Sequence, residues 1–278
     1  MVAELTVEEA GLTSADGTRL AYRKWSVSDA RLTLAVFHGH GEHSGRYAAL
    51  AAAMADHRIS TYAVDLRGHG RSDGQRGHLD SWSQWLDDAA AFGELVARES
   101  PGEVVPLGHS FGGAVVLSAV LRGTLKPRRF AVSSPALRTT VQPAAWKLRL
   151  GQVASRLAPR LTLSNEVDAR VLSRDPAVVS AYVDDPLVHP KISVRMYTEW
   201  VAAADQIRRR AGELELPFLM ILGQEDRLID PTGGREVFER AASKAKVLRE
   251  YAGRFHEPFN DYGKEEVFAD LADWLKRS

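Results

Sequence analysis

A serine, an acid and a histidine occur along this chain in the order and settings that acyl-transfer chemistry requires. Ser110 stands in G-H-S-F-G-G, between the apolar run Val104–Leu107 and the small-residue stretch Ala114–Val120. A strand, a sharp turn and a helix form a nucleophile elbow, in which the serine hydroxyl is exposed at the edge of a sheet. A serine hydroxyl is a weak nucleophile and needs a base within hydrogen-bond reach, itself oriented by an acid. The sequence therefore predicts a serine hydrolase with Ser110 as nucleophile.

The predicted acid and base each follow a later apolar strand. Asp226 lies in the loop Gly223–Asp230, where Glu225 and Asp230 are the alternative acids. His256 follows the last predicted strand and is the only histidine beyond Asp226. Serine, acid and then histidine is the chain order expected when each group sits on a loop after a strand of a parallel sheet.

An oxyanion hole needs two backbone N–H donors near the nucleophile. One comes from the residue after the nucleophile, here Phe111, and the other from a loop after an earlier strand. The loop His38–His43 reads H-G-H-G-E-H, and its glycines would let a carbonyl oxygen approach the main chain. We expect the N–H of His40 to be the second donor.

The same loop also fits a metal-binding motif. H-G-H-G-E-H resembles the H-x-H-x-D-H zinc signature of metallo-β-lactamase-type hydrolases, with glutamate in place of aspartate. Imidazoles are good zinc ligands, and a metal-bound water would then be the nucleophile. The other histidines lack the spacing of further ligands, and this alternative leaves Ser110 without a role. A zinc site at His38, His40 and His43 is the remote alternative, because the serine mechanism needs neither a metal nor a cofactor.

The elements that must position these residues alternate between strand and helix. Short apolar strands separated by helices predict an α/β fold with a mainly parallel sheet covered on both faces. The helix over 82–97 places Trp85, Leu86, Ala89, Phe92 and Val96 on one side. The predicted strands and the last helix are Thr18–Trp25, Leu32–Phe37, Thr61–Val64, Val104–Leu107, Phe130–Val132, Phe218–Leu222, Val247–Tyr251 and Glu265–Leu275.

The alternation breaks after the strand near residue 132. From about Leu137 to Asp205 there is no strand-like run, and helical fragments are punctuated by prolines. Such an insertion lies over the strand ends, where open α/β sheets bind their ligands. We therefore expect a helical cap at 138–205, with the core formed by 1–137 and 206–278.

The first part of the cap, Ala144–Leu161, predicts an amphipathic helix. Its apolar residues share one helical face, and basic residues accompany them without an acid before Glu166. The helix either docks on lipid surfaces or packs its apolar face on the protein's own core with solvated basic residues. The apolar residues are Trp146, Leu150, Val153 and Leu157, and the basic ones are Lys147, Arg149, Arg156 and Arg160.

The amino-acid composition excludes several kinds of binding partner and site. Basic and acidic residues both number 36, so no overall charge recruits nucleic acid. Cysteine is absent, which excludes disulfides and thiolate zinc sites. The segment Met1–Glu9 has no basic region followed by an apolar stretch, and no run approaches about 18 apolar residues. We expect a cytoplasmic protein with a small-molecule ester as partner, and peripheral membrane contact only if the cap helix is interfacial.

The chain resembles the monoacylglycerol lipase and lysophospholipase-like branch of the α/β-hydrolases over nearly its whole length. The resemblance rests on motifs from both the loops and the cap, the cap motifs being the more specific to this branch. These are H-G-H-G-E-H-S-G-R-Y (His38–Tyr47), D-L-R-G-H-G-R-S (Asp65–Ser72), G-H-S-F-G-G (Gly108–Gly113), L-S-R-D-P-A-V-V (Leu172–Val179), A-Y-V-D-D-P-L-V (Ala181–Val188), G-Q-E-D-R-L-I-D (Gly223–Asp230) and F-H-E-P-F-N (Phe255–Asn260).

This resemblance implies Ser110, Asp226 and His256 as the triad and the amides of His40 and Phe111 as the oxyanion hole. It also implies an apolar acyl tunnel under the cap and suggests Tyr182 near the alcohol end of the substrate. The family often has a small or apolar residue where this chain has His40, and methionine where it has Phe111. Both differences from the family concern which acyl chains and which alcohols the enzyme accepts in its ester substrate.

The resulting expectation is a serine ester hydrolase that works through an acyl-enzyme. Monoacylglycerols, cleaved to fatty acid and glycerol, are the leading substrates. A lysophospholipase and a broad-specificity carboxylesterase with the same triad are the alternatives. An inactive scaffold of the same fold is a third class, against which the intact set of serine, aspartate and histidine argues.

Overall fold

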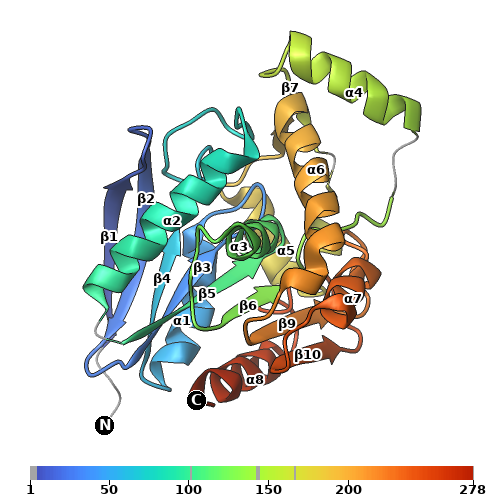
Figure 1. Ribbon diagram of the computed structural model, residues 1–278. Helices are drawn as coiled ribbons and strands as arrows, with labels where there is room; N and C mark the ends of the chain where they lie inside the picture. The colour runs from blue at the N-terminus through green and yellow to red at the C-terminus, as the bar shows by residue number, and fades with distance from the viewer. Residues whose placement is uncertain (1–4, 101, 142–144, 166, 278) are drawn as a thin grey trace.

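The chain is built around one large sheet. The computed structural model describes residues 5–100, 102–141, 145–165 and 167–277. Within these residues, eight strands form a sheet in the order β1-β2-β4-β3-β5-β6-β9-β10 (Figure 1). The β1–β2 and β2–β4 pairs are antiparallel, and every pair from β4 to β10 is parallel. The predicted α/β fold with a mostly parallel sheet is confirmed.

The strands of this sheet are β1 (Leu5–Thr13), β2 (Arg19–Val27), β3 (Leu32–Phe37), β4 (Ile59–Val64), β5 (Glu103–His109), β6 (Phe130–Ser133), β9 (Phe218–Gly223) and β10 (Lys246–Tyr251). The helices that accompany it are η1 (Ser44–Tyr47), α1 (Ala48–Ala55), α2 (Trp82–Glu99), α3 (Phe111–Arg122), η3 (Ala211–Glu213), α7 (Pro231–Arg240) and α8 (Lys264–Lys276). Every predicted strand is present, whereas β1, α1 and α7 were not predicted.

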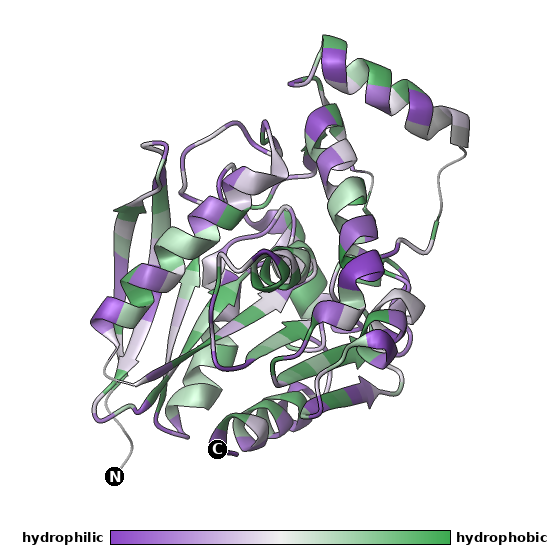
Figure 2. Cartoon of the chain, viewed as in Figure 1, coloured by the Kyte–Doolittle hydropathy of each residue, from purple (hydrophilic) through white to green (hydrophobic). Residues whose placement is uncertain are grey.

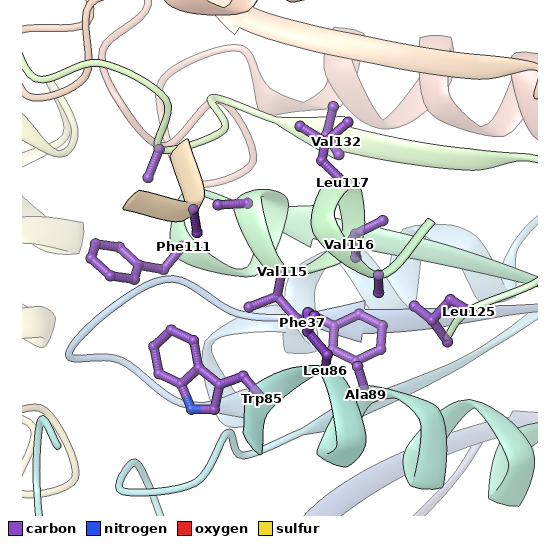
Figure 3. Close-up of a cluster of buried hydrophobic side chains, with 14 of the residues drawn as sticks. Phe37, Trp85, Leu86, Ala89, Phe111, Val115, Val116, Leu117, Leu125 and Val132 are labelled. Atoms are coloured by element: carbon purple, nitrogen blue, oxygen red, sulfur yellow. The ribbon is translucent and has the colours of Figure 1, made fainter. Parts of the chain in front are cut away.

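Helices cover both faces of the sheet, so its inner strands are apolar on both sides. In β9, Phe218 and Met220 pack in the cluster under α2 and α3, while Leu219 and Ile221 pack in the cluster under α1 and α8. Figure 3 shows part of the first cluster, with side chains of α2 and α3 meeting between the helices. The five residues predicted to share one side of α2 are all buried there. Burial on both faces is what a parallel sheet requires.

The segment between β6 and β9 contains the predicted cap. Its elements are α4 (Ala145–Leu157), β7 (Thr162–Ser164), η2 (Ala169–Val171), α5 (Pro176–Asp184), β8 (Lys191–Ser193) and α6 (Val194–Arg210). The strands β7 and β8 pair only with each other, and at three residues each they are too short to show an alternating pattern in the sequence. The cap bounds of 138–205 stay a prediction. The helix α6 continues past residue 205 to Arg210, and it buries Trp200 and Ile207 in the core.

Helix α4 stands away from the sheet and is attached to α6 through polar atoms (Figure 1). The Arg195 guanidinium donates to the Ser155 carbonyl at 2.8 Å, and the Thr198 hydroxyl donates to Ser155 Oγ at 3.0 Å. Ser155 is buried, so α4 turns a polar position toward the protein. The predicted apolar face points outward, with exposed fractions of 63% for Trp146, 60% for Leu150, 53% for Val153 and 82% for Leu157.

Of the two alternatives, packing of this apolar face on the protein's own core is therefore wrong for these residues. Hydrophobic and hydrophilic residues alternate along α4 (Figure 2), and the side chains of Arg149 and Arg156 on this helix and of Arg160 just after it are exposed as well. Ala144 and the Lys147 side chain lie outside the described part of the chain. Within that part, no helix is long and apolar enough to cross a membrane.

Candidate active site

The predicted nucleophile lies in the sharp turn between β5 and α3. Ser110 has φ 51° and ψ −116°, a strained conformation for a residue with a side chain. A Cβ atom at Gly112 would overlap the Phe37 carbonyl, so only glycine lets α3 start this close to β3. The Ser110 amide donates to the Ser133 carbonyl at 2.9 Å and ties the turn to β6. The turn thus presents the hydroxyl at the carboxyl edge of the sheet.

His256 bridges the serine and the predicted acid. Its Nδ1 lies 2.6 Å from Asp226 Oδ2, and its Nε2 lies 2.9 Å from Ser110 Oγ. Because a carboxylate accepts hydrogen bonds, Nδ1 carries the proton and Nε2 has a lone pair facing the serine hydroxyl. All three side chains are buried. This is the geometry in which an imidazole can remove the serine proton as the hydroxyl attacks a carbonyl carbon.

The loop after β9 distinguishes Asp226 from its neighbours. Asp226 Oδ1 accepts hydrogen bonds from the amides of Leu228 and Ile229, both at 2.9 Å, so its other oxygen is directed at the imidazole. Asp230 instead caps α7 by accepting from the Thr232 amide at 2.9 Å. Glu225 is exposed. Of the three candidates, Asp226 alone is placed to orient His256.

The electrostatics of His256 favour its role as a base near neutral pH. Burial disfavours the charged imidazolium, but the Asp226 carboxylate and its hydrogen bond outweigh burial and raise the pKa of His256. The neighbouring His109 behaves in the opposite way. Burial and the closeness of His256 lower the pKa of His109 to about 4, so this second ring beside the site stays neutral.

The loop after β3 lies against the nucleophile. A Cβ atom at Gly39 would come within 3.2 Å of Ser110 Cβ, so a larger residue would push the loop away. The Gly39 amide donates to Glu42 Oε1 at 2.6 Å. Phe111 is the first residue of α3, where helix amides have no partner within the helix. The two predicted oxyanion donors, the amides of His40 and Phe111, therefore belong to segments that meet at Ser110.

A buried ion network holds this loop, and no local sequence pattern predicts a role for its members. The Arg46 guanidinium donates to Glu42 Oε2 and to both carboxylate oxygens of Glu257, each at 2.7 Å. Tyr47 adds a hydroxyl that donates to Glu42 Oε1 at 2.9 Å. Burial opposes ionisation of Glu42, but Arg46 prevails and keeps the pKa of that carboxyl below its usual value. Glu257 follows the predicted base, so the network joins the loop His38–His43 (the oxyanion loop, after its predicted donor His40) to the loop that carries His256.

Comparison with known proteins places this geometry in a family. The family model described as Hydrolase_4, serine aminopeptidase S33, matches residues 28–263. The chain belongs to this family. A monoacylglycerol lipase of Mycolicibacterium smegmatis is 33% identical over 273 residues, covering 97% of each chain. The crystal structure of Paleococcus ferrophilus monoacylglycerol lipase is 31% identical, with a TM-score of 0.81 over 98% of both chains.

One further relative is a much longer protein. An uncharacterized abhydrolase domain-containing protein of Dictyostelium discoideum is 32% identical over 275 residues, which are 98% of this chain and 29% of that protein. Taken together, these similarities confirm the predicted monoacylglycerol lipase-like branch and the α/β-hydrolase fold. The protein is a serine-type ester hydrolase.

The histidines of the oxyanion loop do not gather as the zinc motif predicts. His38 Nδ1 donates to the Gly39 carbonyl, and its Nε2 accepts from the Leu66 amide. His43 Nδ1 accepts from the Gly45 amide, and its Nε2 donates to Asp185. Both rings therefore have both nitrogens engaged in hydrogen bonds within the fold. Among the described residues, no group of three or more candidate ligands is arranged to hold a metal.

The cap of this family member contacts the oxyanion loop directly. The His189 amide donates to the Gly41 carbonyl at 2.9 Å. Tyr182, on α5, lies over the Arg46 guanidinium with 4.8 Å between its ring centroid and Cζ. A Cβ atom at Gly41 would lie 3.5 Å from the Tyr182 hydroxyl. The structure therefore puts Tyr182 beside the loop that contacts Ser110.

Proposed function

We propose that Ser110, His256 and Asp226 hydrolyse carboxylic esters in two steps. Ser110 Oγ attacks the ester carbonyl while His256 Nε2 takes its proton, and Asp226 stabilises the imidazolium that forms. His256 then gives the proton to the leaving alcohol. A water molecule, activated by the same imidazole, attacks the acyl-enzyme and releases the acid. The observation that carries this proposal is the 2.9 Å and 2.6 Å contacts of one imidazole with Ser110 and Asp226.

The amides of His40 and Phe111 are proposed to donate hydrogen bonds to the oxyanion of each tetrahedral intermediate. One such donor is typically worth about 3–4 kcal/mol in the transition state. The contact of Gly39 with Ser110 and the start of α3 at Phe111 support this assignment.

Monoacylglycerols are the proposed substrates, with Tyr182 at the alcohol end. Two relatives that match nearly the whole chain are monoacylglycerol lipases, which supports this substrate class. Tyr182 and the Arg46 network supply hydroxyl and charged groups on one side of the oxyanion loop, where a glycerol hydroxyl could find partners. The Phe111 ring packs on Trp85 and Trp200, at 5.9 Å and 4.8 Å between ring centroids, and these aromatic side chains beside the nucleophile suit an acyl chain.

The cap is proposed to rest on lipid surfaces through α4. Its outward apolar row continues into the next segment, where Leu161 is 52% and Leu163 is 57% exposed. Arg149 and Arg156 are exposed alongside, as expected of a helix that lies at the boundary of an anionic membrane. Because α4 is attached to α6 through Ser155, the side chains of Leu150, Val153 and Leu157 stay exposed and can enter the acyl boundary.

The proposal is tested by hydrolysis of a medium-chain 1-monoacylglycerol with the purified protein, in separate reactions containing a serine-directed phosphonate or EDTA. We expect release of fatty acid and glycerol that the phosphonate stops and EDTA leaves unchanged. Loss of activity with EDTA alone would contradict the serine mechanism. Phosphonate-sensitive cleavage of a lysophospholipid or a p-nitrophenyl ester, with monoacylglycerol untouched, would keep the mechanism and replace the substrate.

A further inference from the structure

Besides the ion network described above, two hydrogen bonds hold the loop between β10 and α8, which carries His256. They lie on either side of this residue. Before it, the Phe255 amide donates to Asp261 Oδ2 at 3.0 Å. After it, the Glu257 amide donates to the Leu172 carbonyl at 2.9 Å. The backbone on both sides of the proposed base is therefore fixed by groups that do not belong to the triad.

The cap supplies one of these two acceptors and binds the other. Leu172 is followed by Ser173 and Arg174 in the cap segment between η2 and α5. The Arg174 amide donates to Asp261 Oδ1 at 3.0 Å, and Arg174 Nε lies 3.1 Å and 3.0 Å from the two carboxylate oxygens. The Ser173 hydroxyl donates to the Asn260 carbonyl at 2.9 Å. Three successive residues of the cap thus contact the loop that carries His256.

The carboxylate of Asp261 is the centre of these contacts. Its side chain is fully buried, and its Oδ1 also accepts a hydrogen bond from the Tyr262 amide at 2.8 Å. A buried carboxylate that loses a partner is costly. Displacement of either the Phe255 amide or the Arg174 guanidinium from Asp261 is therefore opposed.

The loop that carries the acid lies against the same stretch of backbone. A Cβ atom at Gly223 would overlap the Phe255 carbonyl, so only glycine allows this approach at the end of β9. Asp226 follows three residues later. Phe255 thus contacts the end of β9 through its carbonyl and Asp261 through its amide, and His256 is the next residue.

We propose that Asp261 and the cap segment Leu172–Arg174 position the base by fixing the amides on either side of His256. The imidazole is thereby kept between Asp226 and Ser110. The proposal rests on the proposed function, which makes His256 the base. It gives the cap a part in the chemical step, in addition to any part in binding the substrate. Misplacement of a catalytic group by about 1 Å can lower a rate on the order of 10²-fold.

The test compares kcat and KM for p-nitrophenyl acetate, whose acetyl group is too small to fill an acyl-binding site. A cap that only binds acyl chains matters little for this ester, whereas a cap that positions His256 matters for every ester. Asp261→Ala should lower kcat on the order of 10²-fold and change KM little. Arg174→Ala removes only the side-chain contact with Asp261, so kcat should fall about tenfold.

Arg170→Ala is the matched control in the same part of the cap. Arg170 also forms an arginine–carboxylate pair, with Asp168 at 2.7 Å, but both of these residues belong to the cap. Its removal should leave kcat and KM for p-nitrophenyl acetate unchanged.

The pH dependence of kcat/KM separates positioning from a loss of stability. Burial lowers the pKa of His256, but Asp226 outweighs burial and raises it. An imidazole displaced from Asp226 loses part of this effect, so the acid limb should move to lower pH in Asp261→Ala and in Arg174→Ala. Partial unfolding reduces the amount of active enzyme but leaves the midpoint of the acid limb in place. Thermal unfolding of each variant verifies that the assays use folded protein.

If Asp261→Ala does not fold, Arg174→Ala carries the test, because the Arg174 side chain is 31% exposed. Unchanged kcat in folded Arg174→Ala would overturn the proposal, and so would a rise in KM alone. A lower kcat with an unmoved acid limb would overturn it as well, since the loss would then not arise at His256. These outcomes leave the serine mechanism intact. Absence of phosphonate-sensitive hydrolysis in the wild-type protein would instead contradict the proposed function, and this proposal with it.

Discussion

The candidate active site and the cap helix α4 distribute polar and apolar groups in opposite ways. Around Ser110, the side chains of the triad and of the Arg46 network are buried, and each is paired with another member of these groups. On α4 a polar residue, Ser155, faces the protein, and the large apolar side chains face outward. Buried polar groups are costly unless paired, and exposed apolar groups are costly unless covered. The triad and the Arg46 network therefore find their partners within the folded chain, whereas the outward face of α4 needs a partner from outside, which we propose is lipid.

The largest expected effect concerns the nucleophile. Ser110→Ala should lower kcat by on the order of 10⁶, because no other group at the elbow can form the acyl-enzyme. Folding should be preserved, since the alanine side chain fits where the serine Cβ already lies. Ester hydrolysis and thermal unfolding of the same sample measure both expectations. Retained activity in a folded Ser110→Ala protein would remove the basis for treating this region as the reaction centre.

The second largest effect tests whether Asp226 or the nearby Asp230 is the acid that orients His256. Asp226→Asn should lower kcat by about 10⁴, because an amide no longer holds the imidazole in the required tautomer. Asp230→Asn is the matched control. Asparagine also caps helices well, so α7 and the activity should both be preserved in this variant. The reverse outcome, with activity lost only in Asp230→Asn, would show that the acid had been misassigned.

The pH dependence follows from the raised pKa of His256. Only the neutral imidazole can take the serine proton, so kcat/KM should fall about tenfold per unit of pH below this pKa. The acid limb of the profile should therefore have its midpoint above the ordinary histidine value of about 6.5. NMR titration of His256 in Asp226→Asn should give a lower pKa than in the wild type. A midpoint below 6, unchanged by the substitution, would contradict the Asp226–His256 pairing.

The smallest effect tests the outward face of α4. The double substitution Leu150→Ser, Leu157→Ser should weaken binding to anionic vesicles about tenfold, because each exposed leucine loses part of its burial in the acyl region. Hydrolysis of a water-soluble p-nitrophenyl ester should be unchanged. Val7→Ser, which removes an exposed apolar residue of β1, is the control and should leave vesicle binding unaltered. Equal vesicle binding by all three proteins would mean that α4 does not contact lipid.

Much of the fold and of the site follows from local patterns. Ser110 and Asp226 follow the inner, apolar strands β5 and β9, and His256 lies in the loop after the edge strand β10. Since these loops leave the same edge of a parallel sheet, the chain order predicts that the three residues meet. The missed elements lack such patterns. Helix α1 is rich in alanine and has no clear apolar stripe, and β1 is an edge strand with most of its side chains exposed.

The parts that sequence patterns did not reveal depend on contacts between distant segments. Arg46 and Glu257 are 211 residues apart, and nothing local in either segment indicates the ion pair. The orientation of α4 could not be predicted either, because an amphipathic pattern does not say which face meets the protein. That orientation is decided by the polar contacts of Ser155 with α6.

The central claim is that Ser110 is activated by His256 and Asp226. The most direct measurement is the mass-spectrometric mapping of the adduct formed by a serine-directed phosphonate on the wild-type, Ser110→Ala and Asp226→Asn proteins. We predict one adduct, on the peptide that carries Ser110, formed slowly in Asp226→Asn and absent in Ser110→Ala. An adduct at another residue, or inhibition that proceeds without any covalent adduct, would contradict the account.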